Sequence, residues 1–179
     1  ETTLGEVIES ISERFDFSKK EIILINTSDI SEGKVLNHVY SQNIDIKGQF
    51  KKSFRRKDIL YSEIRPQNKR FAYIDFESDD YVASTKLMVL RKKIENIDEQ
   101  FIYTILKSNE IIRTLQTIAE SRSGTFPQIT FEEISRLKVI LPSSYEEQKA
   151  IADVLSSLDE KIELLEEENK TLETLAQTI

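Results

Sequence analysis

The stretch that decides the architecture is residues 146–179, which read EEQKAIADVLSSLDEKIELLEEENKTLETLAQTI. Its apolar side chains recur at alternating steps of four and three residues across four heptads. The d positions hold Ile151, Leu158, Leu165, Leu172 and Ile179, and the a positions hold Leu155, Ile162, Asn169 and Ala176. An unbroken repeat of this kind, without glycine or proline, predicts a helix about 50 Å long at 1.5 Å per residue.

This stretch contains no second apolar core, so we expect it to pair with another helix as a dimerising coiled coil. The polar Asn169 at an a position is expected to set the register of the pair, whether parallel or antiparallel. A terminal helix that lies on its own domain is the alternative. Ser143 or Ser144 is placed to cap the first turn. The chain therefore divides into a domain at residues 1–143 and a long helix at residues 144–179.

Residues 1–143 mix two hydrophobic periods, which predicts an α+β fold: a mixed, β-rich domain with a few helices, followed by the long C-terminal helix. Strand-like apolar runs occupy 22–25, 35–40, 58–62, 70–76, 85–91 and 137–141, and Gly33 marks a turn over 26–34. Helical spacing occurs at 101–106 and 111–119 with a break near Ser108, and residues 3–8 form a short first helix. Thr130 and Glu133 make a capping-box pattern at the start of a further short helix.

The composition excludes several classes of protein. The chain has 179 residues, no cysteine and a single histidine, His38, which excludes disulfides, thiolate or histidine metal clusters and most hydrolase triads. No apolar run approaches the roughly 18 residues of a membrane span, and the first residues do not resemble a signal peptide. We therefore expect a cytoplasmic protein with no membrane contact. The sequence does not begin with Met, which suggests a trimmed or partial chain.

Charge is distributed unevenly along the chain, although the net charge is −7. Residues 145–179 hold ten acidic and three basic side chains, whereas residues 47–70 hold nine basic and two acidic ones. A strongly basic segment and a strongly acidic tail in one chain point to separate partners on separate surfaces.

The basic segment is the main candidate for a nucleic-acid surface, because clustered Lys and Arg neutralise phosphates and release counterions. Arg can also pair with guanine through two hydrogen bonds, and Asn or Gln can pair with adenine. The residues expected to contact double-stranded DNA here are Lys51, Lys52, Arg55, Arg56, Lys57, Arg65, Gln67, Asn68, Lys69 and Arg70. A solvated strand-and-loop surface is the alternative. Arg122, Ser123 and Thr125 lie in a polar loop at 121–127, for which a groove contact and an ordinary connection are both open.

Enzyme chemistry has little support in these residues. The four glycines are scattered without a phosphate-binding spacing. A metal-dependent nuclease needs an acid upstream of a Glu-x-Lys tripeptide, and Asp16 with Glu32-Gly33-Lys34 fits this pattern loosely. The same tripeptide occurs twice inside the acidic helix, at Glu147 and Glu168, which shows how readily it arises by chance. We therefore expect no catalytic residue, no metal site and no cofactor in this chain.

Five motifs follow one another in the second half of the chain: GTFPQI at 124–129, LKVILP at 137–142, EQKAIADVL at 147–155, LDEKI at 158–162 and NKTLETLA at 169–176. LGEV at 4–7 and DILYSEIRP at 58–66 precede them. Together these motifs resemble the specificity (S) subunit of type I restriction–modification enzymes, most closely over residues 121–179. The resemblance spans almost the whole chain, as one target recognition domain followed by one helix.

The resemblance implies a DNA-recognition subunit without a catalytic site. In that family each recognition domain reads one half of a bipartite DNA target, and paired helices fix the spacer between the halves. Modification subunits methylate adenine with S-adenosylmethionine, and a restriction motor subunit can join them. S-adenosylmethionine, ATP and Mg are thus expected to bind partner subunits and not this chain.

The chain departs from the family pattern in having one recognition domain and one helix where the family usually has two of each. Either two copies form a homodimer through the C-terminal helix, or the chain belongs to a longer protein with a second recognition domain. Two alternatives from other classes are a coiled-coil adaptor without a DNA role and a small metal-dependent nuclease. Salt-dependent duplex binding separates DNA recognition from the adaptor.

Overall fold

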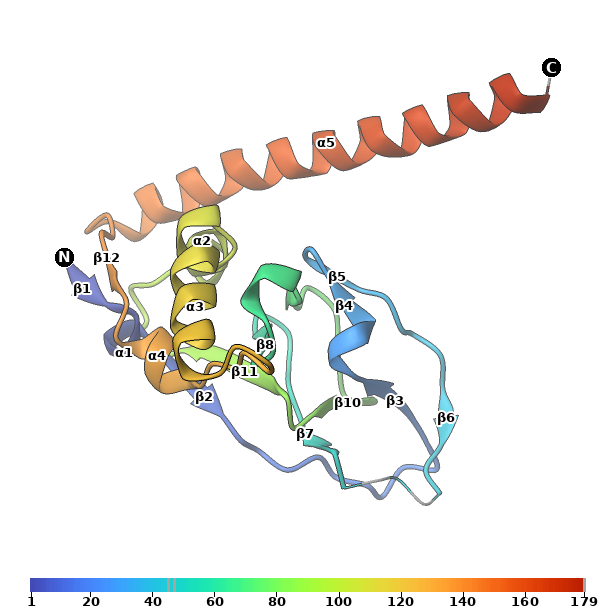
Figure 1. Ribbon diagram of the computed structural model, residues 1–179, viewed down its shortest axis with the longest axis horizontal. Helices are drawn as coiled ribbons and strands as arrows, with labels where there is room; N and C mark the ends of the chain where they lie inside the picture. Colours follow the sequence, from blue (N-terminus) through green and yellow to red (C-terminus); the bar gives the residue numbers. More distant parts are fainter. Residues whose placement is uncertain (45, 47, 179) are drawn as a thin grey trace.

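The computed structural model describes residues 1–44, 46 and 48–178, and shows a domain from which one long helix extends (Figure 1). Lys47, expected in the basic segment, and Ile179, expected at the last d position, lie outside the described residues. Among the helices that are described, none combines the length and the apolar character needed to cross a membrane. The predicted α+β class with a long C-terminal helix is confirmed.

An antiparallel sheet with strand order β2-β11-β8-β9 lies at the centre of the domain. Its strands span Ile8–Ile11, Leu87–Lys92, Ile59–Ser62 and Phe71–Tyr73. β8 and β9 are the two strands predicted on either side of the 65–68 loop, and β11 covers most of the strand predicted at 85–91. All four residues of β8 are buried, because other elements cover both faces of this sheet.

A second sheet, with strand order β6-β3-β10-β7, lies against the first. Its strands span Ser41–Gln42, Glu21–Ile25, Tyr81–Ser84 and Phe50–Lys52. β3 and β10 run parallel, and the outer pairs are antiparallel. The remaining pairs are β4 (Ile30–Ser31) with β5 (Lys34–Val35) after the 3-10 turn η1 (Thr27–Asp29), and β1 (Thr2–Thr3) with β12 (Lys138–Val139). The tight β4–β5 turn needs Gly33, whose φ is +101°.

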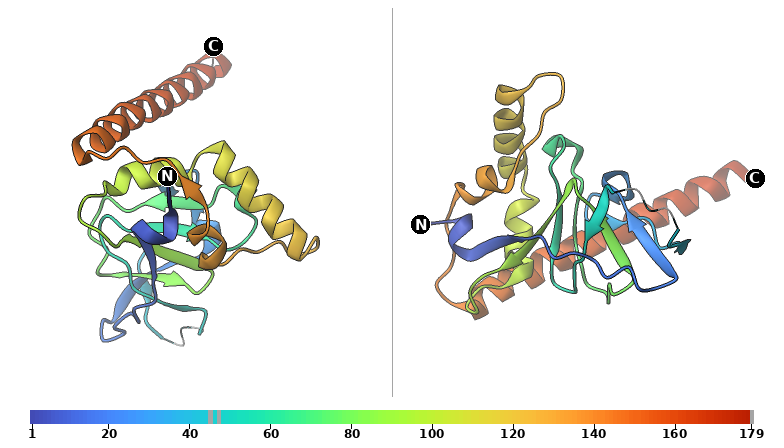
Figure 2. Two further views of the ribbon diagram at one scale, coloured as in Figure 1. Left: turned by 90° about the vertical axis from the view of Figure 1, so that its left-hand side faces the viewer. Right: turned by 90° about the horizontal axis from the view of Figure 1, so that it is seen from below.

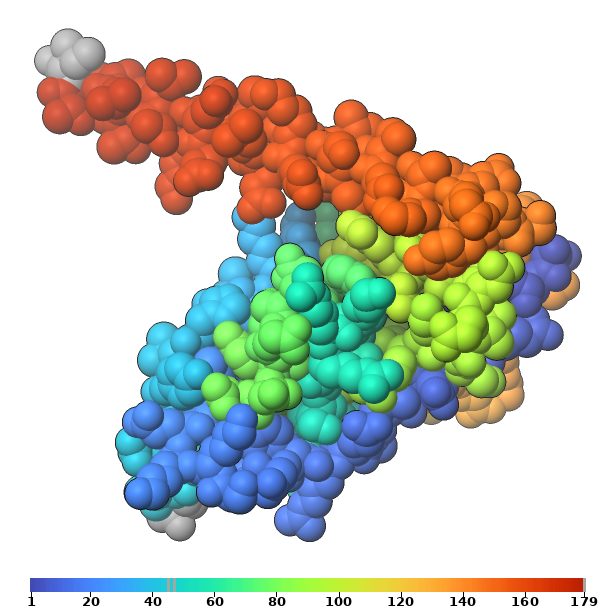
Figure 3. All heavy atoms as spheres, turned by 180° about the vertical axis from the view of Figure 1, so that it is seen from behind, coloured from blue at the N-terminus to red at the C-terminus, as the bar shows by residue number. Residues whose placement is uncertain are grey.

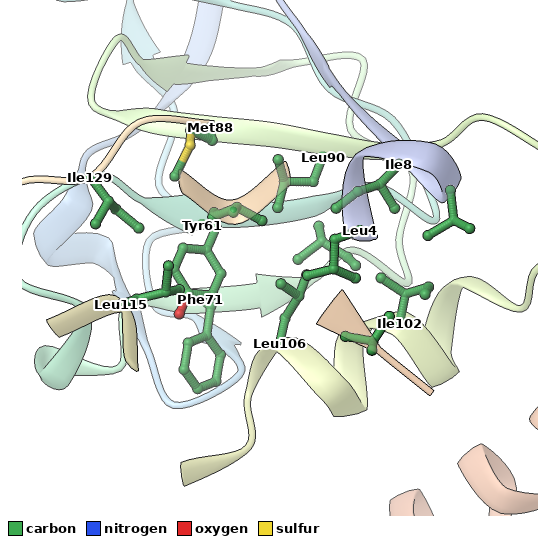
Figure 4. Packing of buried hydrophobic residues seen from close by; sticks show 14 of the residues in the cluster. Leu4, Ile8, Tyr61, Phe71, Met88, Leu90, Ile102, Leu106, Leu115 and Ile129 are labelled. Atoms are coloured by element: carbon green, nitrogen blue, oxygen red, sulfur yellow. The ribbon is translucent and has the colours of Figure 1, made fainter. Parts of the chain in front are cut away.

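Successive side chains of β8 and β11 point to opposite faces of the central sheet, so the apolar core forms two clusters, one on each face. Ile59 and Tyr61 join one cluster with Met88 and Leu90, whereas Leu60 belongs to the other cluster. Figure 4 shows the first cluster, which the helices cover. The second cluster fills the space between the two sheets.

Four helices cover the first cluster: α1 (Leu4–Val7), α2 (Glu99–Leu106), α3 (Asn109–Arg122) and α4 (Phe131–Ser135). The predicted break near Ser108 separates α2 from α3, because the Ser108 hydroxyl accepts from Ile111 N at 3.3 Å and caps α3. Thr130 and Glu133 form the predicted capping box of α4. α1 and α4 pack closely, since a Cβ at Gly5 would lie only 2.8 Å from the Ser135 Cβ.

Helix α5 (Tyr145–Thr178) begins after Ser144, whose hydroxyl accepts from Glu147 N at 3.3 Å. Its first turns pack on α2 through the buried Gln148. The Gln148 side chain donates to Pro142 O at 2.9 Å and accepts from Asp98 N at 3.0 Å. The C-terminal third of α5, red in Figures 1 and 3, extends past the domain.

Three differences from the predicted elements have local causes. The strand predicted at 35–40 is wrong beyond Val35, because Asn37 uses its side chain to accept from Val39 N at 3.1 Å and to donate to Leu24 O at 2.8 Å. The strand predicted at 137–141 shortens to β12. Strands β1, β2, β4, β6, β7 and β10 are missing from the prediction, because most of them mix polar with apolar residues over a few positions. The equally short β8 and β9 lie within the longer predicted runs 58–62 and 70–76.

Candidate nucleic-acid interface

Strand β8 divides the basic segment into two groups. Arg55, Arg56 and Lys57 precede β8, whereas residues 65–70 follow it, so the two groups lie at opposite ends of the central sheet. At about 3.3 Å per residue, a four-residue strand separates its two ends by about 13 Å. Among the described residues, the basic side chains of the segment therefore fall into two groups and not into the single basic face that the charge pattern predicts.

The end that follows β8 brings together residues 63–70, residues 84–86 and residues 123–128, and we call it the loop end. It includes the 3-10 turn η2 (Pro66–Asn68), which lies beside α3 because Gln67 N donates to Gln116 Oε1 at 3.1 Å. Figure 2 shows α3 and the loop after it standing out from the body of the domain. Ser123 and Thr125 are exposed on this loop. The fold thus joins two groups of residues that were predicted separately.

Hydrogen bonds hold the loops of the loop end together. Arg65 N donates to Pro127 O at 3.1 Å, and Arg65 Nη2 donates to Thr125 O at 3.3 Å. Ile129 N donates to Glu63 O at 2.9 Å, and the Ile129 side chain is fully buried at the edge of the core cluster (Figure 4). The 123–128 loop is therefore anchored at its C-terminal side.

Lys86 contacts all three segments of the loop end. Its Nζ donates to Gln128 Oε1 at 2.9 Å and to Glu63 Oε2 at 3.3 Å, and its carbonyl accepts from Glu63 N at 3.0 Å. Neither Lys86 nor Gln128 was predicted as a site residue. Lys86 lies outside the basic segment in sequence, and only the pairing of β11 with β8 places it here.

The η2 turn presents side chains to solvent on an unusual backbone. Arg65 and Lys69 have φ values of +45° and +53°, in the left-handed region that residues with a Cβ seldom adopt. Pro66 is buried, whereas Arg65, Gln67 and Asn68 are exposed. Backbone conformations of this kind persist where the surroundings enforce them and are concentrated at binding sites. The turn thus presents a guanidinium and two amides at the surface from a constrained backbone.

Two predicted DNA contacts are committed to other partners. Lys52 Nζ donates to Leu87 O at 2.8 Å and Thr85 O at 3.1 Å, and burial lowers the pKa of Lys52. Lys52 therefore supports the turn that carries Lys86, in place of the DNA contact predicted for it. Arg122 forms an ion pair with Glu133 on α4, which holds its guanidinium at the end of α3.

The other predicted residues near this end have looser contacts with their partners. Lys69 lies 3.9 Å from Glu32, and Arg70 Nη1 donates to Thr27 Oγ1 at a long 3.4 Å. Both side chains are half-buried. Lys51 is exposed on the edge strand β7.

The opposite end of the sheet carries a basic basin, which is a cavity of about 320 Å³ lined by Arg55, Arg56, Lys57, Arg91, Lys92 and Lys93. Figure 3 shows this side, with the segments near residues 55 and 95 in teal and yellow-green. Buried Asp58 accepts from Arg91 Nε at 2.7 Å and Nη2 at 2.8 Å. Glu99 lies 3.0 Å from Lys92 and 3.9 Å from Lys57. Asp58 and Glu99 thus offset two of the six positive charges that line the basin.

Helix α5 turns two different faces towards its surroundings. Gln148, Ala152, Ser156, Asp159 and Glu163 face the domain, and the last three contact Gln100, Lys107 and Lys34. The residues predicted at the a and d positions form an apolar seam along α5. Each seam residue from Ile151 to Ile162 comes one position before a domain-facing residue, which places it about 100° around the helix from that residue. The seam residues Leu155, Leu158, Ile162, Leu165, Asn169, Leu172 and Ala176 are exposed, and Ile151 is half-buried. The helix therefore lies on its own domain as far as Glu163, as the alternative predicts, while most of the seam stays exposed and pairing with another helix stays a prediction.

The candidate nuclease residues have ordinary partners. Asp16 accepts from Ser18 N and Oγ, Glu32 lies 3.9 Å from Lys69, and Lys34 pairs with Glu163. In the part of the chain that the structure describes, no three His, Cys, Asp or Glu residues are grouped to hold a metal ion. These residues take the roles of a turn and of a helix contact.

The fold and the site together describe an α+β domain whose three loops are bonded to one another. The domain is joined to a long helix with an exposed apolar seam. The chain matches the family described as type I restriction modification DNA specificity domain over residues 1–174, and it belongs to this family. It is 44% identical over 180 residues to the specificity subunit of the type I restriction enzyme HindI of Haemophilus influenzae, a match that covers 100% of this chain and 39% of that protein. The family resemblance seen in the motifs is confirmed.

Solved structures share the fold. The HsdS subunit from Thermoanaerobacter tengcongensis matches with a TM-score of 0.77 and 24% identity, over 92% of this chain and 43% of that chain. A chain from a structural study of complex assembly and conformational transition in the type I R-M system matches with a TM-score of 0.76 and 23% identity, over 91% of this chain and 43% of that one. The chain thus spans less than half the length of these relatives.

Proposed function

We propose that this chain is a target recognition domain that binds one half of a bipartite site in double-stranded DNA. It directs adenine methylation and restriction by partner subunits, and it contributes no catalytic group of its own. The modification subunits and the restriction motor subunit bind S-adenosylmethionine, ATP and Mg. The expected place of action is the cytoplasm, where these partners meet DNA.

The observation that carries this proposal is the construction of the loop end. Arg65, Gln67 and Asn68 have the side-chain types that pair with guanine and adenine edges, and all three are exposed on one turn. Bonds from Arg65 and Lys86 join this turn to the 123–128 loop. Because little ordering is needed on binding, a preorganised surface of this kind favours selective recognition.

The charge of α5 supports the same arrangement. The helix carries the ten acidic residues counted over 145–179, which repel phosphate. DNA is therefore directed to the domain and away from the helix, whose seam is left for a partner helix. The seam supports either a homodimer of this chain or pairing with a second recognition domain of a longer protein.

Duplex binding at several salt concentrations tests the proposal. We expect the affinity to fall steeply between about 50 and 200 mM salt, as phosphate contacts require. On the target half-site, Arg65→Ala is expected to cost about 1–3 kcal/mol and to relax recognition at one base pair. The matched control is Arg55→Ala in the basic basin, which we expect to leave the sequence preference unchanged.

Two results would change this assignment. If Arg65→Ala weakened binding to every duplex equally, Arg65 would contact phosphate and not a base. If binding were absent or independent of salt, the coiled-coil adaptor would be the better description.

A further inference from the structure

We propose that Phe126 makes an apolar contact with the DNA bases in the groove that the loop end enters. This inference rests on the proposed DNA binding and adds a specific residue to it. None of the residues expected to contact DNA was apolar, and Phe126 was not among them.

Phe126 is exposed where the chain around it is anchored. It is 49% exposed, whereas the next residue, Pro127, is buried and Ile129 is fully buried. The chain therefore enters the core directly after Phe126 but leaves this ring outside. Gly124, two residues before Phe126, borders open space, since a Cβ added there would meet no atom within 4 Å.

The backbone on both sides of Phe126 is held by one residue. Arg65 Nη2 donates to Thr125 O at 3.3 Å, and Arg65 N donates to Pro127 O at 3.1 Å. Phe126 N donates to Ser123 Oγ at 3.2 Å. An exposed aromatic ring on a restrained backbone loses little conformational entropy when it binds, which favours a role in contact.

Basic side chains near Phe126 suit the phosphates that border a DNA groove. Arg65 contacts the residues on both sides of the ring, and Lys86 contacts Gln128 Oε1 at 2.9 Å. Arg65 is thus bonded to both neighbours of Phe126, and Lys86, which also pairs with Glu63 at 3.3 Å, contacts the same loop two residues further on. Basic groups near an apolar ring suit a groove in which phosphates border the apolar surfaces of stacked bases. Proteins use Phe in this setting either as a wedge between base pairs or against the methyl group of thymine.

The test compares variants of the intact protein with its modification subunit on two end-labelled duplexes. One duplex carries the target motif at which the complex methylates adenine. The other has the same base composition, but the half-site that this chain binds is scrambled. Phe126→Ala is expected to weaken binding to the motif about tenfold, and Phe126→Leu is expected to weaken it less. The matched control is Ile94→Ala, because Ile94 is 45% exposed and lines the basic basin at the opposite end of the sheet.

Two further measurements distinguish the modes of contact. A wedge predicts that the wild-type protein bends the duplex in an end-to-end fluorescence transfer experiment and that Phe126→Ala reduces the bend. A methyl contact predicts that replacing thymine by uracil in the half-site weakens the wild type and leaves Phe126→Ala unaffected. Either result supports the proposal.

Several results would overturn the proposal. Equal affinity, bend and uracil response in Phe126→Ala and the wild type would show that the ring does not contact DNA. Unchanged DNA binding with loss of the modification subunit would assign Phe126 to a protein contact. A large, equal fall in melting temperature for the Ala and Leu variants would assign it to folding. If the wild type did not prefer the motif to the scrambled duplex, the proposed function itself would fail.

Discussion

Lys86 is the residue that joins the three segments of the loop end, through Gln128 and Glu63. We expect Lys86→Met and Gln128→Ala each to lower the preference for target over scrambled DNA, because each releases the 123–128 loop from the turn after β8. The two changes share one contact, so the double variant is expected to be non-additive by about 0.5–3 kcal/mol. The measurement is a double-mutant cycle of duplex affinity.

The salt dependence separates this positioning role from a direct contact. Loss of a positioning residue is expected to leave the slope of log affinity against log salt unchanged. A slope reduced by about one for Lys86→Met, with no effect of Gln128→Ala, would instead identify Lys86 as a phosphate contact.

Tyr61 places a polar hydroxyl in the apolar core, which lowers the stability of the folded domain. Its hydroxyl is buried and has no hydrogen-bond partner among the described residues, and burial raises the pKa of Tyr61. We expect Tyr61→Phe to stabilise the domain by about 1 kcal/mol, because an unpaired buried hydroxyl is removed while the ring stays in place. Thermal unfolding measures this effect. A destabilisation of similar size would mean that the hydroxyl is paired, for example with a buried water.

At the scale of single elements, segments within a clear apolar or helical pattern were predictable, and short segments of mixed polarity were not. The strands around the 65–68 loop, the two helices separated at Ser108 and the long C-terminal helix follow directly from hydrophobic period and capping. β2, β6, β7 and β10 depend on partners that are distant in sequence. The division of the basic segment was missed for the same reason, since a charge count does not show that β8 carries the chain across the sheet.

The seam of α5 gives a prediction with a close internal control. Leu165 lies on the seam, whereas the adjacent Leu164 lies about 100° away, and their exposed fractions are 44% and 48%. If the seam forms a homodimer, the wild-type chain has twice the 20.8 kDa mass in light scattering. We expect Leu165→Asp to reduce the mass to that of one chain and Leu164→Asp to leave the pair intact. A Leu165→Asp variant that keeps twice the mass of one chain would refute homodimer pairing through this seam.

At the scale of the whole molecule, polar contacts set the angle between α5 and the domain. Lys107–Asp159 and Lys34–Glu163 cross a groove of about 690 Å³. Lys107 is half-buried, and the other three side chains are exposed. Exposed ion pairs contribute about 0–1 kcal/mol each and weaken with salt. The angle of α5 is therefore expected to be adjustable, while its first turns stay fixed through the buried Gln148.

Distance measurements between labels on the domain and near the end of α5 test this expectation. Lys107→Glu is expected to broaden the distance distribution, because like charges then face each other across the groove. Lys170→Glu is the control, since no ion pair of Lys170 occurs in the described part of the chain. An unchanged distribution for Lys107→Glu, at low and high salt, would show that packing on α2 alone sets the angle.

The most direct test is to map methylated adenines in cells that express the native protein with its modification subunit. We predict a bipartite motif in which Arg65→Ala relaxes or abolishes the half read by this chain, while Arg55→Ala with Arg56→Ala in the basic basin leaves the motif unchanged. A palindromic motif would indicate two copies of this domain, and an asymmetric motif would indicate a different second domain. A motif altered by the basin variants and unaffected by changes at the loop end would contradict recognition through the loop end.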